Sequence, residues 1–241
     1  MDWERFWEEY PRRFDDTEFR RQGGRTARGG VPTPAEELEV VLAEAVERLE
    51  LGRSHRLLDL CCGNGYLTER LAAVAREVVG VDFSEPMLEI ARRFHGGDAS
   101  DGEGSVRYVQ GSVLELDEVL GPPADVPPFD RVCMLESLHY FEPHQLGPML
   151  AGIVDRTTPE AVVYLSGVTD AARKDNFFDT PERRAEHRRR KAEGTDVMGH
   201  WWRKDEIEGP AERLGMRCEF HPQNPALNTA HYRFDVVLRK G

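Results

Sequence analysis

The topology of this chain is set between residues 57 and 66, which read Leu57-Leu58-Asp59-Leu60-Cys61-Cys62-Gly63-Asn64-Gly65-Tyr66. A short apolar strand, expected over 56–60, runs into a turn of small residues that contains two glycines. A helical pattern follows over 66–76. Glycine lets a backbone approach a ligand closely, and a helix N-terminus offers free N–H groups and a positive dipole end. The stretch therefore predicts a strand, a ligand-binding turn and a helix.

An acidic residue closes the next predicted strand, over 77–82. Asp82 comes 23 residues after Asp59, where an acid can accept hydrogen bonds from both ribose hydroxyls of a nucleotide. A dinucleotide-binding loop would also need glycines at its first, third and sixth positions. A count from Cys61 and a count from Gly63 both fail that pattern. The two features together indicate a nucleoside whose charged group is smaller than a pyrophosphate.

The rest of the chain continues the alternation of strands and helices. Such alternation is typical of parallel βαβ units and of a doubly wound sheet. The last two strands follow each other closely enough to pair antiparallel. Further strands are predicted over 106–110, 131–135, 161–168, 216–221 and 232–239, and helices over 84–94, 146–154 and 204–214.

The segment from Asp59 to Leu67 resembles the first motif of class I methyltransferases, commonly written D-x-G-x-G-x-G. Cys61 stands where that family usually has its first glycine, and Asp82 matches its ribose-binding acid. The resemblance covers the chain from about Thr33 to Val168, and more loosely the two closing strands. It implies an α/β fold with a doubly wound, seven-stranded, mostly parallel sheet and an antiparallel last strand. It also implies S-adenosylmethionine as cofactor, bound across the carboxyl ends of the first strands.

The resemblance assigns roles to residues around the cofactor. The backbone at the two glycines would run along the methionine part of the cofactor. Asp59 would anchor the loop, and Asp82 would bind the ribose. Phe83 and Met87 would line the adenine side, and Ser112 stands where relatives usually have an aspartate. The full predicted set is Asp59, Cys61, Gly63, Gly65, Asp82, Phe83, Met87, Ser112, Val113 and Leu135.

The stretch 129–141 matches the fourth strand and exit loop of that family, which in many small-molecule enzymes separates cofactor and acceptor. His139 is the candidate general base, since histidine titrates nearest neutrality; a loop histidine bonded to backbone is the alternative. Glu136 would orient the acceptor or the methionine amino group, unless it is a solvated carboxylate. The loop lacks the N-P-P-Y or D-P-P-Y tetrapeptide of enzymes that methylate amino groups of bases and glutamine, and no metal is expected.

Two segments outside the alternating core are expected to cover the site. Residues 1–32 form an N-terminal helical and loop cap whose aromatic stripe includes Tyr10, and 33–241 form the methyltransferase domain. Within that domain, 169–202 is a predicted lid. Its helix over 181–193 carries six basic residues against three acids, which is either a solvated face or an attraction for an anionic acceptor. Acceptor contacts are predicted for Tyr10, His139, Tyr140, His200, Trp201 and Trp202; for the paired tryptophans, pinning the lid to the core is the alternative.

Composition limits the partners. The formal net charge of -12 disfavours nucleic acid, and no run of about 20 apolar residues could span a membrane. The N-terminal acids do not suit a signal peptide, and the four cysteines follow no zinc or disulfide spacing, which indicates reduced thiols and a cytoplasmic protein. The predicted function is methyl transfer to an oxygen, hydroxyl or carboxylate, of a small metabolite. The alternatives are N-methylation of a small amine, a catalytically inactive cofactor-binding module, or a nicotinamide-dependent oxidoreductase; oligomeric state is open.

Overall fold

The structure is a computed structural model of the whole chain, and it describes residues 1–23, 26–27, 31–96 and 104–241. Residues 24–25 and 28–30 of the predicted N-terminal cap therefore lie outside the described residues. The same holds for most of the connection between the helix that ends at Phe94 and the strand that begins at Ser105.

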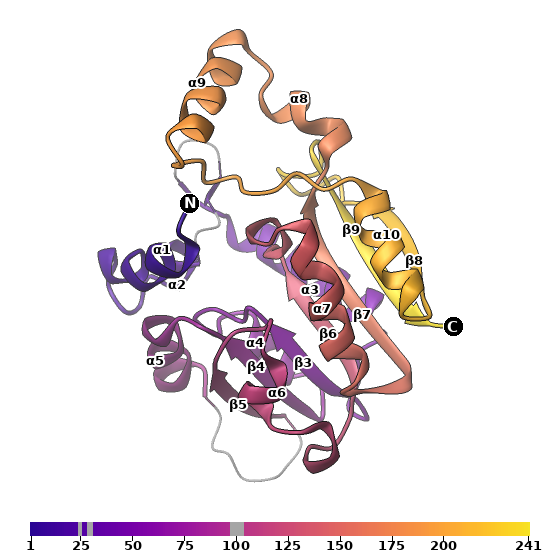
Figure 1. Cartoon of the computed structure of the whole chain (residues 1–241). Helices are drawn as coiled ribbons and strands as arrows, with labels where there is room; N and C mark the ends of the chain where they lie inside the picture. The colour runs from indigo at the N-terminus through magenta and orange to yellow at the C-terminus, as the bar shows by residue number, and fades with distance from the viewer. Residues whose placement is uncertain (24–25, 28–30, 97–103) are drawn as a thin grey trace.

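A seven-stranded sheet forms the centre of the protein (Figure 1), in the order β5-β4-β3-β6-β7-β9-β8. All neighbours pair parallel except β9, which runs antiparallel to both β7 and β8. The predicted doubly wound, mostly parallel sheet is confirmed. The strands are β3 (Arg56–Leu60), β4 (Glu77–Asp82), β5 (Ser105–Gln110), β6 (Phe129–Leu135), β7 (Thr157–Thr169), β8 (Met216–Pro222) and β9 (Arg233–Lys240), with a separate two-stranded ribbon of β1 (Thr26–Ala27) and β2 (Val31–Pro32).

Helices cover both faces of this sheet and bury one apolar core on each. One core contains apolar residues of α3, α4 and α5, and the other contains those of α6, α7 and α10. The central strand β3 is buried at all five positions, as expected for a parallel strand covered on both sides. The helices are α1 (Trp3–Glu9), α2 (Phe19–Gln22), α3 (Ala35–Arg48), α4 (Thr68–Ala72), α5 (Glu85–Phe94), α6 (Leu116–Leu120), α7 (Pro143–Val154), α8 (Lys174–Phe177), α9 (Pro181–Ala192) and α10 (Lys204–Arg213).

The N-terminal helices are hydrogen-bonded to both predicted ligand loops. Asn64, between the two glycines, donates from Nδ2 to the carbonyl of Phe19 at 2.8 Å and to Oε1 of Gln22 at 2.9 Å. Ser84, which follows β4, donates its hydroxyl to the carbonyl of Trp7 at 2.9 Å. Because these partners are largely buried, the N-terminal segment is held over the carboxyl ends of β3 and β4.

A bulge in β7 shapes the sheet beside the exit of β6. The pairing of β7 with β9 shifts register between Leu165 and Val168, and Gly167 there has a φ of +64°. A Cβ at Gly167 would clash with the side chain of Glu136. Asp235 on β9 fixes the bulge, because its carboxylate accepts from the Gly167 N–H at 2.7 Å and from the Tyr164 hydroxyl at 2.9 Å. The bulge therefore makes room for an acidic side chain at the sheet edge.

The carboxyl group of Asp235 should make the stability of the protein depend on pH. Burial raises the pKa of its carboxyl to about 6, from an ordinary 3.8. The folded state thus holds this proton more tightly than the unfolded chain, so stability falls as pH rises from about 4 to 6. We expect Asp235→Asn to gain about 2 kcal/mol relative to the parent at pH 7.5, and the gain to vanish towards pH 4. Urea unfolding at both pH values measures it.

The exposed acid Asp125 provides the control, since Asp125→Asn should leave the pH dependence of stability unchanged. A difference between Asp235→Asn and the parent that stays constant from pH 4 to 7.5 would contradict the assignment. In that case the hydrogen bonds at Gly167 and Tyr164, and not burial of the charge, would determine the effect of the substitution.

Candidate functional site

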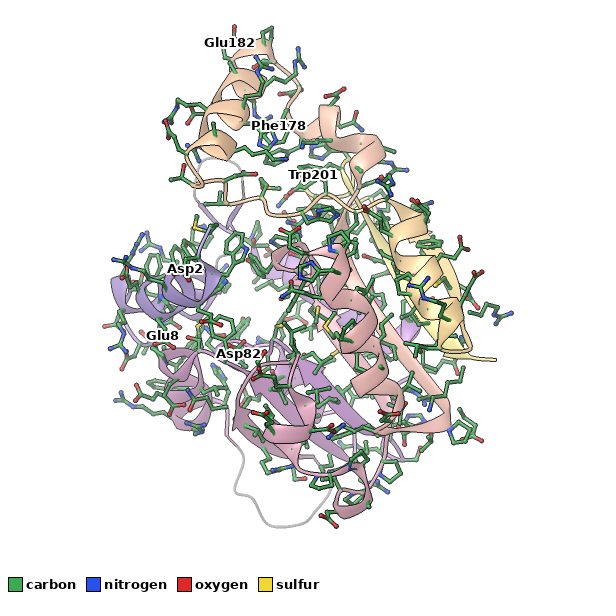
Figure 2. All side chains as sticks on the ribbon, viewed as in Figure 1. Asp2, Glu8, Asp82, Phe178, Glu182 and Trp201 are labelled. Atoms are coloured by element: carbon green, nitrogen blue, oxygen red, sulfur yellow. The ribbon has the colours of Figure 1, made fainter. Side chains whose placement is uncertain are left out.

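A cavity of about 690 Å³ lies at the carboxyl ends of the first strands. Its walls combine the glycine loop after β3, the end of β4, the exit of β6 and the start of β9 with side chains of α1 and α9. Figure 2 shows Asp82 at the strand edge on the side that faces α1, which carries Glu8. This volume lies within the range for small-molecule sites, in the place where doubly wound sheets bind ligands.

The glycine loop adopts left-handed backbone conformations at three positions. Cys61, Gly63 and Gly65 have φ values of +58°, +57° and +77°. Left-handed backbone is costly for residues that carry a Cβ. This cost explains why class I methyltransferases, which the chain resembles, usually have glycine at the position of Cys61. Cys61 and Gly63 line the cavity. Gly65 does not, because it packs beneath Tyr108, whose hydroxyl a Cβ at this position would overlap.

Asp59 links β3 to α4 and β6, and Asp82 holds the backbone of the glycine loop. The Asp59 carboxylate accepts from the Thr68 hydroxyl at 2.7 Å and from the Cys133 thiol at 3.2 Å, and burial raises its pKa to about 6. Asp82 accepts from the backbone N–H of Gly63 and of Ser84, both at 2.9 Å. Both acids line the cavity. Burial also raises the pKa of Asp82, although backbone hydrogen bonds oppose that shift.

The residues predicted for the adenine side divide into two groups. Phe83, Met87 and Leu135 line the cavity. Ser112 and Val113 do not line it: the Ser112 hydroxyl accepts from the Leu114 N–H at 3.2 Å in the turn after β5, and Val113 is buried in the core. The turn directs both side chains to structural partners, so the described cavity has no counterpart of the aspartate usual in relatives.

The exit of β6 brings acidic, basic and aromatic side chains together. Glu136 has a φ of +54° and is buried, with Oε2 3.2 Å from Nη1 of Arg233 on β9. A non-glycine residue in this conformation stores strain, which is commonly found at functional sites. His139, Tyr140 and Tyr10 also line the cavity, as predicted for acceptor contacts, and α1 packs on Tyr140 through Trp3 with ring centroids 4.6 Å apart.

His139 is buried and electrically neutral at physiological pH. Burial is the main cause that lowers its pKa well below 6.5, and the positive charge of Arg233 adds to it. Its Nδ1 is buried without a hydrogen-bond partner, whereas its carbonyl accepts from the His200 N–H at 2.8 Å. A neutral imidazole with a low pKa is a weak base, so its side chain is better suited to hydrogen-bond an acceptor than to store a proton.

The paired tryptophans and His200 do not line the cavity. Trp202 is fully buried in the core and donates from Nε1 to the carbonyl of Leu138 at 3.1 Å. Trp201 packs with Phe178 and Tyr232, and Figure 2 shows Trp201 and Phe178 beneath α9, between that helix and the sheet. These contacts fit the alternative interpretation, in which the tryptophans attach the predicted lid to the core.

The basic helix forms as predicted, within one residue at its C-terminal end. Three of its six basic residues form ion pairs with nearby acids: Arg183, Arg189 and Arg190. Arg189 contacts Glu186 at 2.7 Å and Glu193 at 2.6 Å. Arg183 lines the cavity, but it also pairs with Asp179 at 2.8 Å. Ion pairing therefore reduces the free positive charge of the helix below what its composition indicates.

Sequence reasoning missed Arg233 and several aromatic residues of the cavity wall. Arg233 lies at the start of the last strand, next to His231 and Tyr232, which also line the cavity. The only signal was the position at the start of a strand beside the site. Its partner Glu136 packs against Gly167 in the β7 bulge, and the sequence pattern does not reveal this bulge.

The described residues contain no group of three or more His, Cys, Asp or Glu side chains able to hold a metal ion. Likewise, no helix in the described ranges has the length and apolar character needed to cross a bilayer.

The sheet order and the cavity at the carboxyl ends of β3 and β4 define a class I methyltransferase fold. Residues 57–160 match the family described as a methyltransferase domain. A segment of 85 residues is 40% identical to the ubiquinone biosynthesis O-methyltransferase of Alkalilimnicola ehrlichii, and it covers 35% of this chain and 31% of that relative. The chain is thus matched over about a third of that relative's length.

Solved structures share this fold over nearly the whole chain. A methyltransferase from Anabaena variabilis, described as S-adenosylmethionine-dependent, has a TM-score of 0.69 at 16% identity over 99% of this chain and 93% of its own. Magnesium protoporphyrin IX methyltransferase from Synechocystis, with bound S-adenosylhomocysteine, has a TM-score of 0.64 at 14% identity over 99% and 98%. The chain therefore has the class I methyltransferase fold, and its residues 57–160 match the methyltransferase-domain family.

Proposed function

We propose that this protein transfers the methyl group of S-adenosylmethionine to an oxygen of a small-molecule acceptor. The observation that carries the proposal is the continuity of the cavity. One space contains the glycine loop with Asp82 at one side, and Glu136, His139 and Arg233 at the other. A volume in the upper half of the usual range leaves room for a nucleoside cofactor and a small acceptor together.

The residues of the first side fit the cofactor. Gly63 lines the cavity, where its missing side chain leaves the backbone open to close approach. Each Asp82 oxygen already accepts one backbone hydrogen bond and keeps a further lone pair, which suits ribose hydroxyls. Phe83 and Met87 supply apolar walls for a purine. When bound here, S-adenosylmethionine supplies a methyl group activated by a sulfonium.

The chain's own contribution to the reaction is positioning and exclusion of water. Alignment of two reactants can supply effective molarities of about 10⁵ M or more. Trp3, Phe6, Trp7 and Tyr10 of the N-terminal segment close one wall of the cavity against Tyr140. Because His139 is a weak base, an acceptor oxygen that is already acidic is favoured over an alcohol.

The proposal is tested by calorimetry and a transfer assay. The purified protein should bind S-adenosylmethionine and S-adenosylhomocysteine, and incubation with labelled S-adenosylmethionine and an extract of small metabolites should yield S-adenosylhomocysteine and a methylated product. Mass spectrometry and alkaline hydrolysis of the product then distinguish methyl esters from ethers and amines. Binding without any product would support the inactive cofactor-binding module, and a labelled amine would contradict transfer to oxygen.

A further inference from the structure

We infer that Arg233 and His139 form an anchoring subsite for an acidic oxygen, such as a carboxylate, on an otherwise apolar or aromatic acceptor. The inference rests on the proposed function and specifies the chemical class of its acceptor. It assigns a specificity-determining role to Arg233, which lies at the first position of β9.

Buried side-chain nitrogens that make no hydrogen bond are the first observation. The Arg233 side chain is 10% exposed, and its buried Nε and Nη1 make no hydrogen bond, although Nη1 lies 3.2 Å from Oε2 of Glu136 in an ion pair. His139 Nδ1 is in the same situation. Among described residues that line the cavity, these two alone have buried side-chain nitrogens of this kind. Buried polar groups in native proteins are nearly always satisfied, so donors left open beside a ligand cavity point to a ligand atom.

The chemistry of the donors is the second observation. A guanidinium presents five N–H donors in a rigid fork that matches the two oxygens of a carboxylate. Glu136 approaches Nη1 at 3.2 Å and neutralises the charge of Arg233 in the protein alone. The Tyr232 ring lies 5.3 Å from the guanidinium carbon and limits its movement. Arg233 is therefore a fixed cation that can exchange part of its pairing with Glu136 for a ligand oxygen.

The distribution of charge along the sheet edge is the third observation. The acids Asp59 and Asp82 lie near the carboxyl ends of β3 and β4, where Asp59 accepts from Thr68 of α4 and Asp82 accepts from Gly63 of the glycine loop. Arg233 lies on β9, three strands from β3 in the sheet order. At about 4.8 Å between neighbouring strands, that separation is roughly 14 Å, which leaves the length of a cofactor between the two groups. The anionic end of an acceptor would therefore contact Arg233, on the side of the cavity away from Asp59 and Asp82.

The surroundings of Arg233 define the rest of the acceptor. One apolar cluster beside Arg233 lines the cavity and contains Phe177, Met198 and Tyr232. Tyr140 lines the cavity next to His139. These side chains offer apolar and aromatic contact but few charges. An acceptor that combines a flat apolar body with one acidic oxygen would satisfy both the walls and the fork.

Benzoate, benzamide and benzylamine serve as probes, because they share one ring and differ in charge. Their affinities are measured by calorimetry on protein saturated with S-adenosylhomocysteine. Benzoate should bind at least tenfold more tightly than benzamide, and Arg233→Gln should remove that preference. Glu136→Gln should instead strengthen benzoate binding about fivefold, because it removes the competing carboxylate. A merely structural ion pair would not give effects of opposite sign.

Two controls keep the outcome clear. The double variant Arg233→Gln with Glu136→Gln avoids an unpaired buried charge and should also lose the preference for benzoate. Arg173→Gln, on an exposed arginine outside the cavity, should leave it intact. Equal binding of benzoate and benzamide, stronger binding of benzylamine, or no binding of benzoate overturns the inference. Failure to bind S-adenosylhomocysteine at all would instead contradict the proposed function.

Discussion

Replacing Asp82 with alanine should weaken S-adenosylmethionine binding by roughly 10- to 150-fold in isothermal titration calorimetry. This loss corresponds to about 1.5–3 kcal/mol, the range for hydrogen bonds to a charged group. We expect a value near the upper end, because the substitution removes two things at once. It deletes an acceptor for ribose hydroxyls, and it releases the N–H groups of Gly63 and Ser84 that the carboxylate now holds at 2.9 Å.

Glu89 offers a matched control for this measurement. It is an exposed acid on α5, the helix that follows Asp82, and it does not line the cavity. Glu89→Ala should therefore leave the affinity within twofold of the parent. If Asp82→Ala keeps both its melting temperature and its affinity, the carboxylate neither binds the cofactor nor shapes the loop that does.

The parts of the fold that the sequence predicts well are those where burial and hydrogen bonding follow the same pattern. The strands over 56–60 and 77–82 match β3 and β4 residue for residue, because their apolar runs are covered on both faces. The helix expected over 66–76 is shorter, since α4 spans Thr68–Ala72. Its apolar period continues to Val74, but the N–H of Val74 bonds to the carbonyl of Leu71 in a turn. Periodicity reports which side chains are buried, not which backbone groups remain helical.

The residues of the candidate site fall into two groups: those placed by local sequence order and those placed by contacts between distant segments. Cavity residues near Gly63 and Asp82 follow from the local order of strand, turn and acid, so the sequence reaches them. Arg233 and Trp202 depend on contacts between distant segments. The pair of tryptophans could have formed an acceptor wall or attached the predicted lid, and Trp202 is fully buried in the core that contains residues of α7 and α10. Residue type alone does not distinguish a large buried side chain from one that lines a cavity.

Gly199→Ala should destabilise the segment that follows α9 and disturb His139. Gly199 has a φ of +63°, and a Cβ there would overlap the carbonyl oxygen of His139, which is backbone and cannot rotate away. The same carbonyl accepts from the His200 N–H at 2.8 Å, and the Trp3 ring would lie 3.5 Å from the added carbon. Left-handed strain of about 1 kcal/mol and overpacking of about 1–3 kcal/mol together predict a loss of roughly 2–4 kcal/mol.

Gly194 separates these two causes, because it has a φ of +67° and no other atom within 4 Å of an added Cβ. Gly194→Ala should cost only about 1 kcal/mol in urea unfolding, the left-handed strain alone. Hydrogen exchange at the His200 N–H should accelerate in Gly199→Ala but not in Gly194→Ala, since only the former pushes that donor from the His139 carbonyl. Equal losses in the two variants would mean that the loop yields without moving His139. The larger loss at Gly199 would tie the attachment of the predicted lid directly to the residue that we place beside the acceptor.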